Sequence, residues 1–309
     1  MSQSTFPNDP LWPRAGEWLQ RQTTTPQPDV PVDLGIIGVP AFRTSISPTG
    51  AHATPTAIRE ALMRYSTHTA GRASHIGDLN AHDFGDIEEP DGPEGEVRVR
   101  EAVTAAKERC RLLIALGGDN SVTYSVMRGL AGDALADWGL VTVDAHHDVR
   151  DGETNGSPVR RLVDAGLSGS HIVQIGIADF VNSPAYAARA HELGITVIPR
   201  TAMRSRTMTE VADEALRVAG HGGRPVYVDL DVDVCDRSVA PACPASAPGG
   251  LAADELRELT FALASDKRVE VIDVTEVDAT ADTLDGRTVR LAALQVLEVA
   301  AGLASREGR

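Results

Sequence analysis

Three side chains that can bind a metal ion follow one apolar run. Asp144, His146 and Asp148 come after Val141–Val143 at a spacing of two residues. Alternate residues of an extended strand point to the same side, so we expect these three side chains on one face. One imidazole among carboxylates suits a borderline divalent ion such as Mn²⁺, Zn²⁺ or Co²⁺ better than Ca²⁺. The alternative is that this spacing marks a surface turn.

A second acidic array lies further along the chain. Val226–Val234 alternates apolar residues with Asp229, Asp231 and Asp233. The alternative interpretation is an edge strand with a solvated acidic face. Three like charges along one face repel one another, and aspartate disfavours strands. Because a bound cation relieves that cost, we favour metal binding over a solvated face.

A third polar cluster follows the apolar run Leu112–Leu116. It reads Gly117-Gly118-Asp119-Asn120-Ser121 and leads into a helix-like segment that starts at Val122. Alone, this pattern is typical of an ordinary strand-to-helix turn, in which Ser121 or Asn120 caps the helix.

The elements that must position these clusters alternate along the chain. Apolar patterns predict strands at Leu34–Val39, Leu112–Leu116, Leu140–Asp144, Ile172–Ile177, Thr196–Pro199, Val226–Val234 and Val269–Thr275. Amphipathic patterns predict helices at Pro55–Tyr65, Val97–Arg109, Ser183–His191, Thr209–Ala219, Ala253–Ala264 and Val289–Ala301. Strands separated by helices indicate βαβ units and a mostly parallel sheet. Ligands of such sheets lie at the carboxyl ends of the strands, where all three clusters fall.

We therefore predict an α/β fold, a three-layer sandwich with a mostly parallel central sheet and helices on both faces. The 309 residues, 42% of them hydrophobic, suffice for one large domain over 1–309. Residues 1–31 are rich in proline, threonine and glutamine and predict an irregular arm with a short helix near Trp12–Gln20. The acidic, Gly/Pro-containing segment Glu88–Glu96 predicts a solvated loop.

Charge and composition limit the partners. A net charge of −15 argues against nucleic acid and anionic membranes. No apolar run approaches the length of a transmembrane helix, and the polar N-terminus does not resemble a signal peptide. Three cysteines form a sparse, odd set that favours reduced thiols. We expect a cytoplasmic homo-oligomer that acts on a small molecule.

Together these clusters resemble the ureohydrolase family, which includes arginase, agmatinase and formimidoylglutamase. The matching segments extend over most of the chain: Gly38-Val39-Pro40, Pro55–Arg59, Gly117–Ser121, Asp144–Asp148, Asp231 and Asp233 with Asp236, Pro241-Ala242, Gly249-Gly250, and Val274–Val277. No single motif would suffice, but their order along the chain makes the resemblance specific. It implies an arginase-like fold.

The resemblance also implies two Mn²⁺ ions bridged by a hydroxide, which serves as the nucleophile. Carried over onto this chain, the metal ligands are Asn120, Asp144, His146, Asp148, Asp231 and Asp233. Asp144 and Asp231 would bind both ions, and Asp229 would orient a ligand. Glu276 would bind a cationic amidine or guanidine group and aim it at the nucleophile. Asp148 would also carry the proton to the leaving amine.

Two residues depart from the family pattern. Asn120 stands where a histidine ligand is usual, and a neutral amide binds Mn²⁺-type ions more weakly, so the second ion should be weakly held. The departure is compatible with a disabled site, but some formimidoylglutamases also have asparagine there. Asn155, in Thr154–Arg161, stands where agmatinases have a histidine, which argues against an ordinary agmatinase or arginase.

The charge of the substrate follows from Arg150, two residues after Asp148. Arginase has an asparagine here that contacts the substrate carboxylate, and an arginine fork binds a carboxylate bidentately. Agmatine, with two positive charges, would be repelled. Other candidate substrate contacts are Asn155, Ser157 and Asp179. Arg43 and Arg160 are further candidates, with surface salt bridges as the alternative.

The sequence thus predicts a metal-dependent hydrolase of a linear amidine. The preferred reaction converts N-formimidoyl-L-glutamate and water to L-glutamate and formamide, a step of histidine metabolism. One alternative is a guanidino hydrolase: an agmatinase, a guanidinobutyrase or a hydroxyarginine amidinohydrolase. Another is a ureohydrolase-like binding protein whose catalysis is impaired by Asn120.

Overall fold

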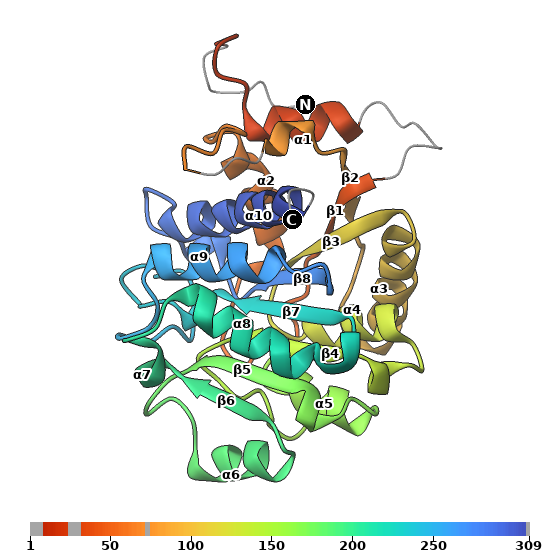
Figure 1. The fold of residues 1–309 in the computed structure, drawn as a ribbon, viewed down its shortest axis with the longest axis vertical. Helices are drawn as coiled ribbons and strands as arrows, with labels where there is room; N and C mark the ends of the chain where they lie inside the picture. Colours follow the sequence, from red (N-terminus) through yellow and green to blue (C-terminus); the bar gives the residue numbers. More distant parts are fainter. Residues whose placement is uncertain (1–8, 24–31, 72–74, 307–309) are drawn as a thin grey trace.

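One parallel sheet organises the computed structural model, which describes residues 9–23, 32–71 and 75–306. The strands are β1 (Val32–Val39), β2 (Ala81–Asp86), β3 (Cys110–Gly117), β4 (Gly139–Val143), β5 (Ile172–Ile177), β6 (Thr196–Pro199), β7 (Val226–Asp231) and β8 (Val269–Thr275). They lie in the order β2-β1-β3-β8-β7-β4-β5-β6, with every neighbouring pair parallel (Figure 1). The predicted α/β class is confirmed.

Helices cover both faces of this sheet. They are α1 (Ala15–Thr23), α2 (Thr54–Leu62), α3 (Gly92–Lys107), α4 (Val122–Ala131), α5 (Pro158–Asp164), α6 (Pro184–Glu192), α7 (Arg200–Met203), α8 (Met208–Ala219), α9 (Ala253–Ala264) and α10 (Arg287–Ser305). One apolar core joins the sheet to α1, α2, α8, α9 and α10, and a second joins it to α3, α4 and α5. The molecule is therefore the expected three-layer sandwich.

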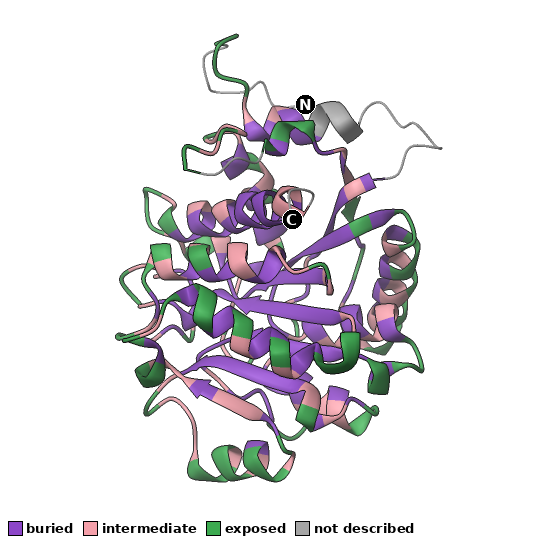
Figure 2. Ribbon diagram, in the orientation of Figure 1, coloured by how far each residue is buried: buried purple, intermediate pink, exposed green. Residues whose placement is uncertain are grey.

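Most of the central strands are apolar on both faces because each face meets a layer of helices. Within β3, Leu112 and Ile114 belong to the first core, and Leu113 belongs to the second. Figure 2 shows the strands buried between helices whose outer surfaces are exposed. Continuous apolar runs of this kind are expected for parallel strands covered on both sides.

The edge strand β2 and the start of α3 differ from the sequence-based expectation. The edge strand β2 was not predicted, because its sequence Ala-His-Asp-Phe-Gly-Asp is largely polar and it pairs only with β1. The predicted loop Glu88–Glu96 was wrong in its second half, since α3 begins at Gly92. Pro93 in the first turn of α3 lacks only an N–H that would be unpaired there anyway, so it starts the helix rather than a loop.

The predicted N-terminal arm contains an ordered helix. Helix α1 overlaps the expected Trp12–Gln20 helix, and its buried Trp18 donates a hydrogen bond from Nε1 to the carbonyl of Leu79 at 3.3 Å. Residues 1–8 and 24–31 of the arm lie outside the described residues.

Helix α10 is the longest apolar helix in the described part of the chain. By length and hydropathy it could cross a membrane, but 67% of its most apolar window is buried in the fold. It packs against α9 and α2, as a core helix does.

Candidate metal centre

Four adjacent strands bring the predicted site residues together. In the sheet, β3, β8, β7 and β4 are successive neighbours. Asn120, Glu276 and Asp144 follow the carboxyl ends of β3, β8 and β4, and Asp231 is the last residue of β7. Because parallel strands end at the same edge, residues 156 positions apart meet: the Asn120 N–H donates to Glu276 Oε1 at 2.7 Å.

The first acidic cluster reaches the site from a loop. Strand β4 ends at Val143, so the predicted strand face carrying Asp144, His146 and Asp148 was wrong in its geometry. Instead, the His146 N–H donates to Asp144 Oδ1 at 2.6 Å, and Asp148 has φ +52°. A non-glycine residue in this left-handed region is strained, and such strain is often found at functional sites.

The second cluster bends in the same way. Strand β7 ends at Asp231, and Val232–Val234 forms a short 3₁₀ helix, so the predicted strand Val226–Val234 was too long. The Asp233 N–H donates to Asp231 Oδ1 at 2.8 Å, and Asp233 Oδ1 accepts a bond from the Ala145 N–H at 3.4 Å. The turn swings Asp233 toward the β4 loop.

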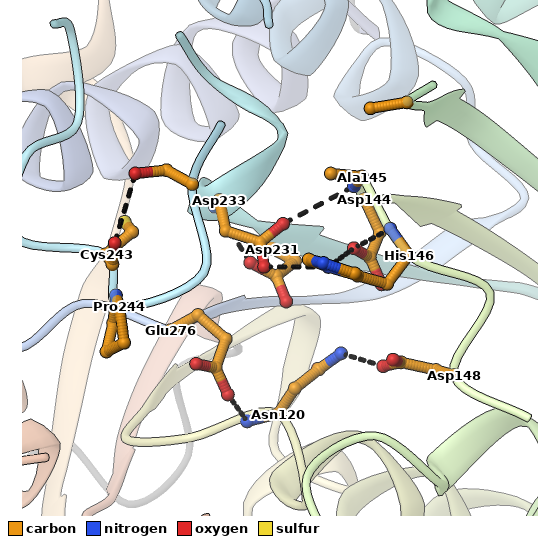
Figure 3. A network of polar contacts seen from close by, with 12 residues as sticks. Asn120, Asp144, Ala145, His146, Asp148, Asp231, Asp233, Cys243, Pro244 and Glu276 are labelled. Atoms are coloured by element: carbon orange, nitrogen blue, oxygen red, sulfur yellow. Dashed lines mark hydrogen bonds and ion pairs between the residues drawn. The ribbon is translucent and has the colours of Figure 1, made fainter. Parts of the chain in front are cut away.

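Asp144, His146 and Asp233 form a compact ligand set (Figure 3). One ligand atom from each lies within 4.8 Å of the others. His146 Nδ1 is 3.0 Å from Asp233 Oδ2 and 3.3 Å from Asp144 Oδ1. Asp144 Oδ2 is buried without a hydrogen-bond partner. A buried carboxylate oxygen of this kind is what a divalent cation satisfies, so these residues fit a metal ion.

The electrostatics of the cluster also favour a cation. Burial, followed by repulsion from neighbouring carboxylates, raises the pKa of Asp144 and of Asp231 well above the usual range. Burial would lower the pKa of His146, but Asp233 and Asp144 outweigh it and raise that pKa to about 12. A metal ion would replace these protons as the compensating charge.

Glu276 is fixed from two sides. Its Oε1 accepts bonds from the Asn120 N–H and, at 2.8 Å, from Asn155 Nδ2. Its backbone has φ +62°, directly after β8. Burial, and next the charge of Asp119, raise the pKa of Glu276 to about 8. With Oε1 held by two donors, Oε2 remains for a cationic ligand.

A cavity of about 340 Å³ opens over these groups. The predicted residues in its wall are His146, Asp148, Arg150, Asn155, Asp231, Asp233 and Glu276. Arg150 is exposed at this wall, and its guanidinium carbon lies 5.6 Å from the ring centroid of Tyr186. Within the described residues, Arg150 makes no ion pair. Among the described residues, the cavity wall thus combines four carboxyl groups with one arginine that has no ion pair.

Other predicted residues lie outside the cavity wall. Asn120 is buried beside it and donates from Nδ2 to Asp148 Oδ2 at 2.6 Å. Ser157 is buried, and its hydroxyl donates to the carbonyl of Thr154 at 2.7 Å. Asp179 is exposed and does not line the cavity. Ser157 and Asp179 therefore do not line the cavity.

The two alternative arginines are also placed away from the cavity wall. Arg160 donates to the carbonyl of Arg150 at 2.7 Å and pairs with Asp164. Arg43 is exposed, and its N–H donates to Asp91 Oδ1 at 2.8 Å. Arg160 thus supports the loop that carries Arg150, and neither arginine lines the cavity.

Sequence reasoning missed several groups around the site. Tyr186, in the first turn of α6, lines the cavity beside Arg150. Thr123 and Thr275 contact Asn120 through their hydroxyls. Isolated tyrosines and threonines carry no spacing signal. However, Thr275 adjoins Glu276, and its position at a strand end could have drawn attention to it.

Comparisons with known proteins agree with this geometry. The arginase family model matches residues 32–302. A formimidoylglutamase of Halalkalibacterium halodurans is 36% identical over 278 residues, covering 87% of this chain and 86% of that protein. A guanidinopropionase of Pseudomonas aeruginosa is 32% identical, covering 90% and 89%. The crystal structure of formimidoylglutamase from Bacillus subtilis superposes with a TM-score of 0.89 at 31% identity, covering 98% of this chain and 96% of that one.

Proposed function

We propose that this chain, which belongs to the arginase family, hydrolyses N-formimidoyl-L-glutamate to L-glutamate and formamide. The observation that carries the proposal is Arg150, a cation without an ion pair among the described residues, at the wall of a cavity that also holds four carboxyl groups. A substrate with a cationic amidine at one end and carboxylates at the other matches both charges. The relative from H. halodurans, a formimidoylglutamase, supports this choice.

The ligand set supports two divalent ions, which we propose to be Mn²⁺. Asp144, His146 and Asp233 would help to hold one ion, and Asp144 and Asp231 would be ligands of both. Asp148 and Asn120 would complete the second site. One imidazole among carboxylates suits Mn²⁺ or a similar ion. Such a pair of ions supplies an activated water molecule, so no protein nucleophile is needed.

Glu276 would bind the amidine. Its Oε1 is held by Asn120 and Asn155, so the direction of Oε2 is fixed before substrate arrives. Because the amidine is planar and cationic, a buried carboxylate can pair with it and orient its carbon toward the activated water.

Asp148 would move the proton. It is buried in the cavity wall, within hydrogen-bond distance of Asn120. In that position its carboxylate could take a proton from the attacking water and give it to the leaving amine nitrogen. The C–N bond breaks as that nitrogen becomes the amino group of glutamate.

A second candidate is a guanidino acid as substrate. The P. aeruginosa guanidinopropionase supports it, because a guanidino acid also presents one cation and one carboxylate. Agmatine fits less well, since its second positive charge would face Arg150. A binding protein without catalysis, the remaining alternative, would hold metal but release no product.

The three cysteines, Cys110, Cys235 and Cys243, are buried and unpaired. Free thiols are typical of reducing compartments, which supports our proposal of a cytoplasmic location.

The test identifies the products of the metal-loaded protein. Protein supplied with Mn²⁺ and N-formimidoyl-L-glutamate should release glutamate and formamide in equal amounts, and chelation should abolish the reaction. Release of urea from a guanidino acid, without turnover of the amidine, would favour the second candidate. Absence of both products from protein that retains metal would favour the binding protein.

A further inference from the structure

The side-chain amide of Asn120 lies between a carboxylate and two hydroxyls. Its Nδ2 faces Asp148 Oδ2 at 2.6 Å. Oδ1 faces Thr123 Oγ1 at 2.8 Å and Thr275 Oγ1 at 3.2 Å. In this orientation the amide oxygen points away from Asp148, and so away from the proposed second ion.

Each of the two hydroxyls has another acceptor. Thr123 Oγ1 lies 2.8 Å from Asp273 Oδ2, and Thr275 Oγ1 lies 3.4 Å from Asp229 Oδ1. Asp273 is surrounded by donors, because it also accepts bonds from the Tyr227 hydroxyl at 2.5 Å and the Leu230 N–H at 3.3 Å. Asp273 is therefore the accepting end of this chain of contacts.

The number of protons decides the orientation of the amide. A hydroxyl has a single proton, and the carboxylate of Asp273 has none to give. When Thr123 donates to Asp273, the Asn120 oxygen faces a lone pair of Thr123 across 2.8 Å without a hydrogen between them. When Thr123 donates to Asn120, the same conflict arises with Asp273. An amide whose oxygen faces Thr123 cannot satisfy both contacts.

We propose that the Asn120 amide is turned by half a rotation, and that Thr123 is the positioning residue that holds it there. The oxygen and nitrogen of an amide have nearly the same shape, so the turn moves no other atom. Nδ2 then donates hydrogen bonds to the hydroxyls of Thr123 and Thr275. These hydroxyls in turn donate hydrogen bonds to the carboxyl groups of Asp273 and Asp229. Each of these four contacts then has one hydrogen, and the contact between Asn120 and Asp148 has none.

This orientation aims Oδ1 at the second ion site. Two acceptors, Asn120 Oδ1 and Asp148 Oδ2, then lie side by side, and a cation bound to both relieves their repulsion. The inference rests on the proposed function, in that it requires a two-ion centre. It explains how Asn120 can act as a ligand: the contacts of Nδ2 with the Thr123 and Thr275 hydroxyls hold the amide so that its oxygen faces the ion.

The experiment compares Thr123→Val with Thr123→Ser by titration calorimetry with Mn²⁺. Valine keeps the shape of threonine but removes the hydroxyl, whereas serine keeps the hydroxyl. We expect Thr123→Val to weaken the second ion by about 10–100-fold, the usual effect of losing a group that orients a ligand. The first ion should bind as before, and Thr123→Ser should retain both ions.

The outcomes separate this inference from the function it rests on. Two ions bound by Thr123→Val as tightly as by the unmodified protein contradict the inference alone. Unmodified protein that binds a single ion contradicts the two-ion function and the inference together. If Thr123→Val does not fold, Thr275→Val against Thr275→Ser provides the same comparison, and equal affinities in that pair contradict the inference. A crystal structure with Mn²⁺ should show Asn120 Oδ1 as a ligand.

Discussion

Replacing Arg150 with alanine removes the guanidinium from the wall of the cavity. In the proposed complex that group forms a charged hydrogen bond to a substrate carboxylate, worth about 1.5–3 kcal/mol. Arg150 is exposed, so solvent screening favours the lower end of that range. A loss of about 1.5 kcal/mol corresponds to a rise of roughly tenfold in KM.

The assay measures KM and kcat for N-formimidoyl-L-glutamate with Mn²⁺-loaded protein. Arg43→Ala is the matched control, because it removes the same charge from an exposed position outside the cavity wall. We expect it to change KM by no more than about twofold, as is usual for surface substitutions. For agmatine the change in KM should have the opposite sign, because Arg150→Ala removes a charge that repels this substrate and should therefore lower KM. An unchanged KM for the amidine, or equal effects of both variants, would refute the assignment of Arg150.

Three further predictions concern the metal centre. Asn120→His should tighten the second Mn²⁺, because imidazole is the stronger ligand; two equally tight ions in the unmodified protein, measured by calorimetry, would contradict this. Asp144→Ala or Asp231→Ala should remove metal and nearly all turnover, whereas Asp229→Ala should cost only about 10–100-fold in kcat; equal losses would remove the distinction. Burial raises the pKa of Glu276 from 4.5 to about 8, so in metal-free protein the folded state retains protons that the unfolded state releases between those values. The free energy of unfolding should therefore fall more steeply with rising pH in the unmodified protein than in Glu276→Gln, measured by urea denaturation with a chelator; equal slopes in the two proteins would contradict the raised pKa.

Much of the fold could be predicted because the sheet is buried on both sides. Apolar runs such as those of β3 and β4 are unmistakable when no face meets water, and strands separated by helices fix the parallel arrangement. The edge strand β2 has no such signal, because its side chains are largely polar and partly exposed. Its pairing with β1 depends on tertiary contacts that no local pattern encodes.

The ligands of the site were easier to predict than its geometry. Asp144, His146 and Asp233 were expected as ligands and do converge, but the sequence implied strands where the chain turns. A spacing of two residues occurs in a strand and also in a turn that a side chain closes. Here the turn is closed by the hydrogen bond from the His146 N–H to the Asp144 side chain. The positive φ of Asp148 could not be foreseen, since neighbouring contacts impose it.

Contacts made by isolated residues could not be predicted at all. Tyr186 meets Arg150 only because α6 packs beside the loop that follows β4. Thr123 reaches both Asn120 and Asp273 because β3 and β8 are neighbours in the sheet. Such contacts depend on the strand order, which the sequence pattern leaves open.

The most direct test of the central claim is the ratio of kcat/KM values for N-formimidoyl-L-glutamate and agmatine, measured with the same Mn²⁺-loaded protein. The two substrates share a planar cationic end and differ in the charge at the other end, which Arg150 would contact. We predict a kcat/KM for the amidine that exceeds the value for agmatine by at least about tenfold, the worth of one charged contact. Equal values, or a preference for agmatine, would contradict the claim that this cavity selects a carboxylate-bearing substrate.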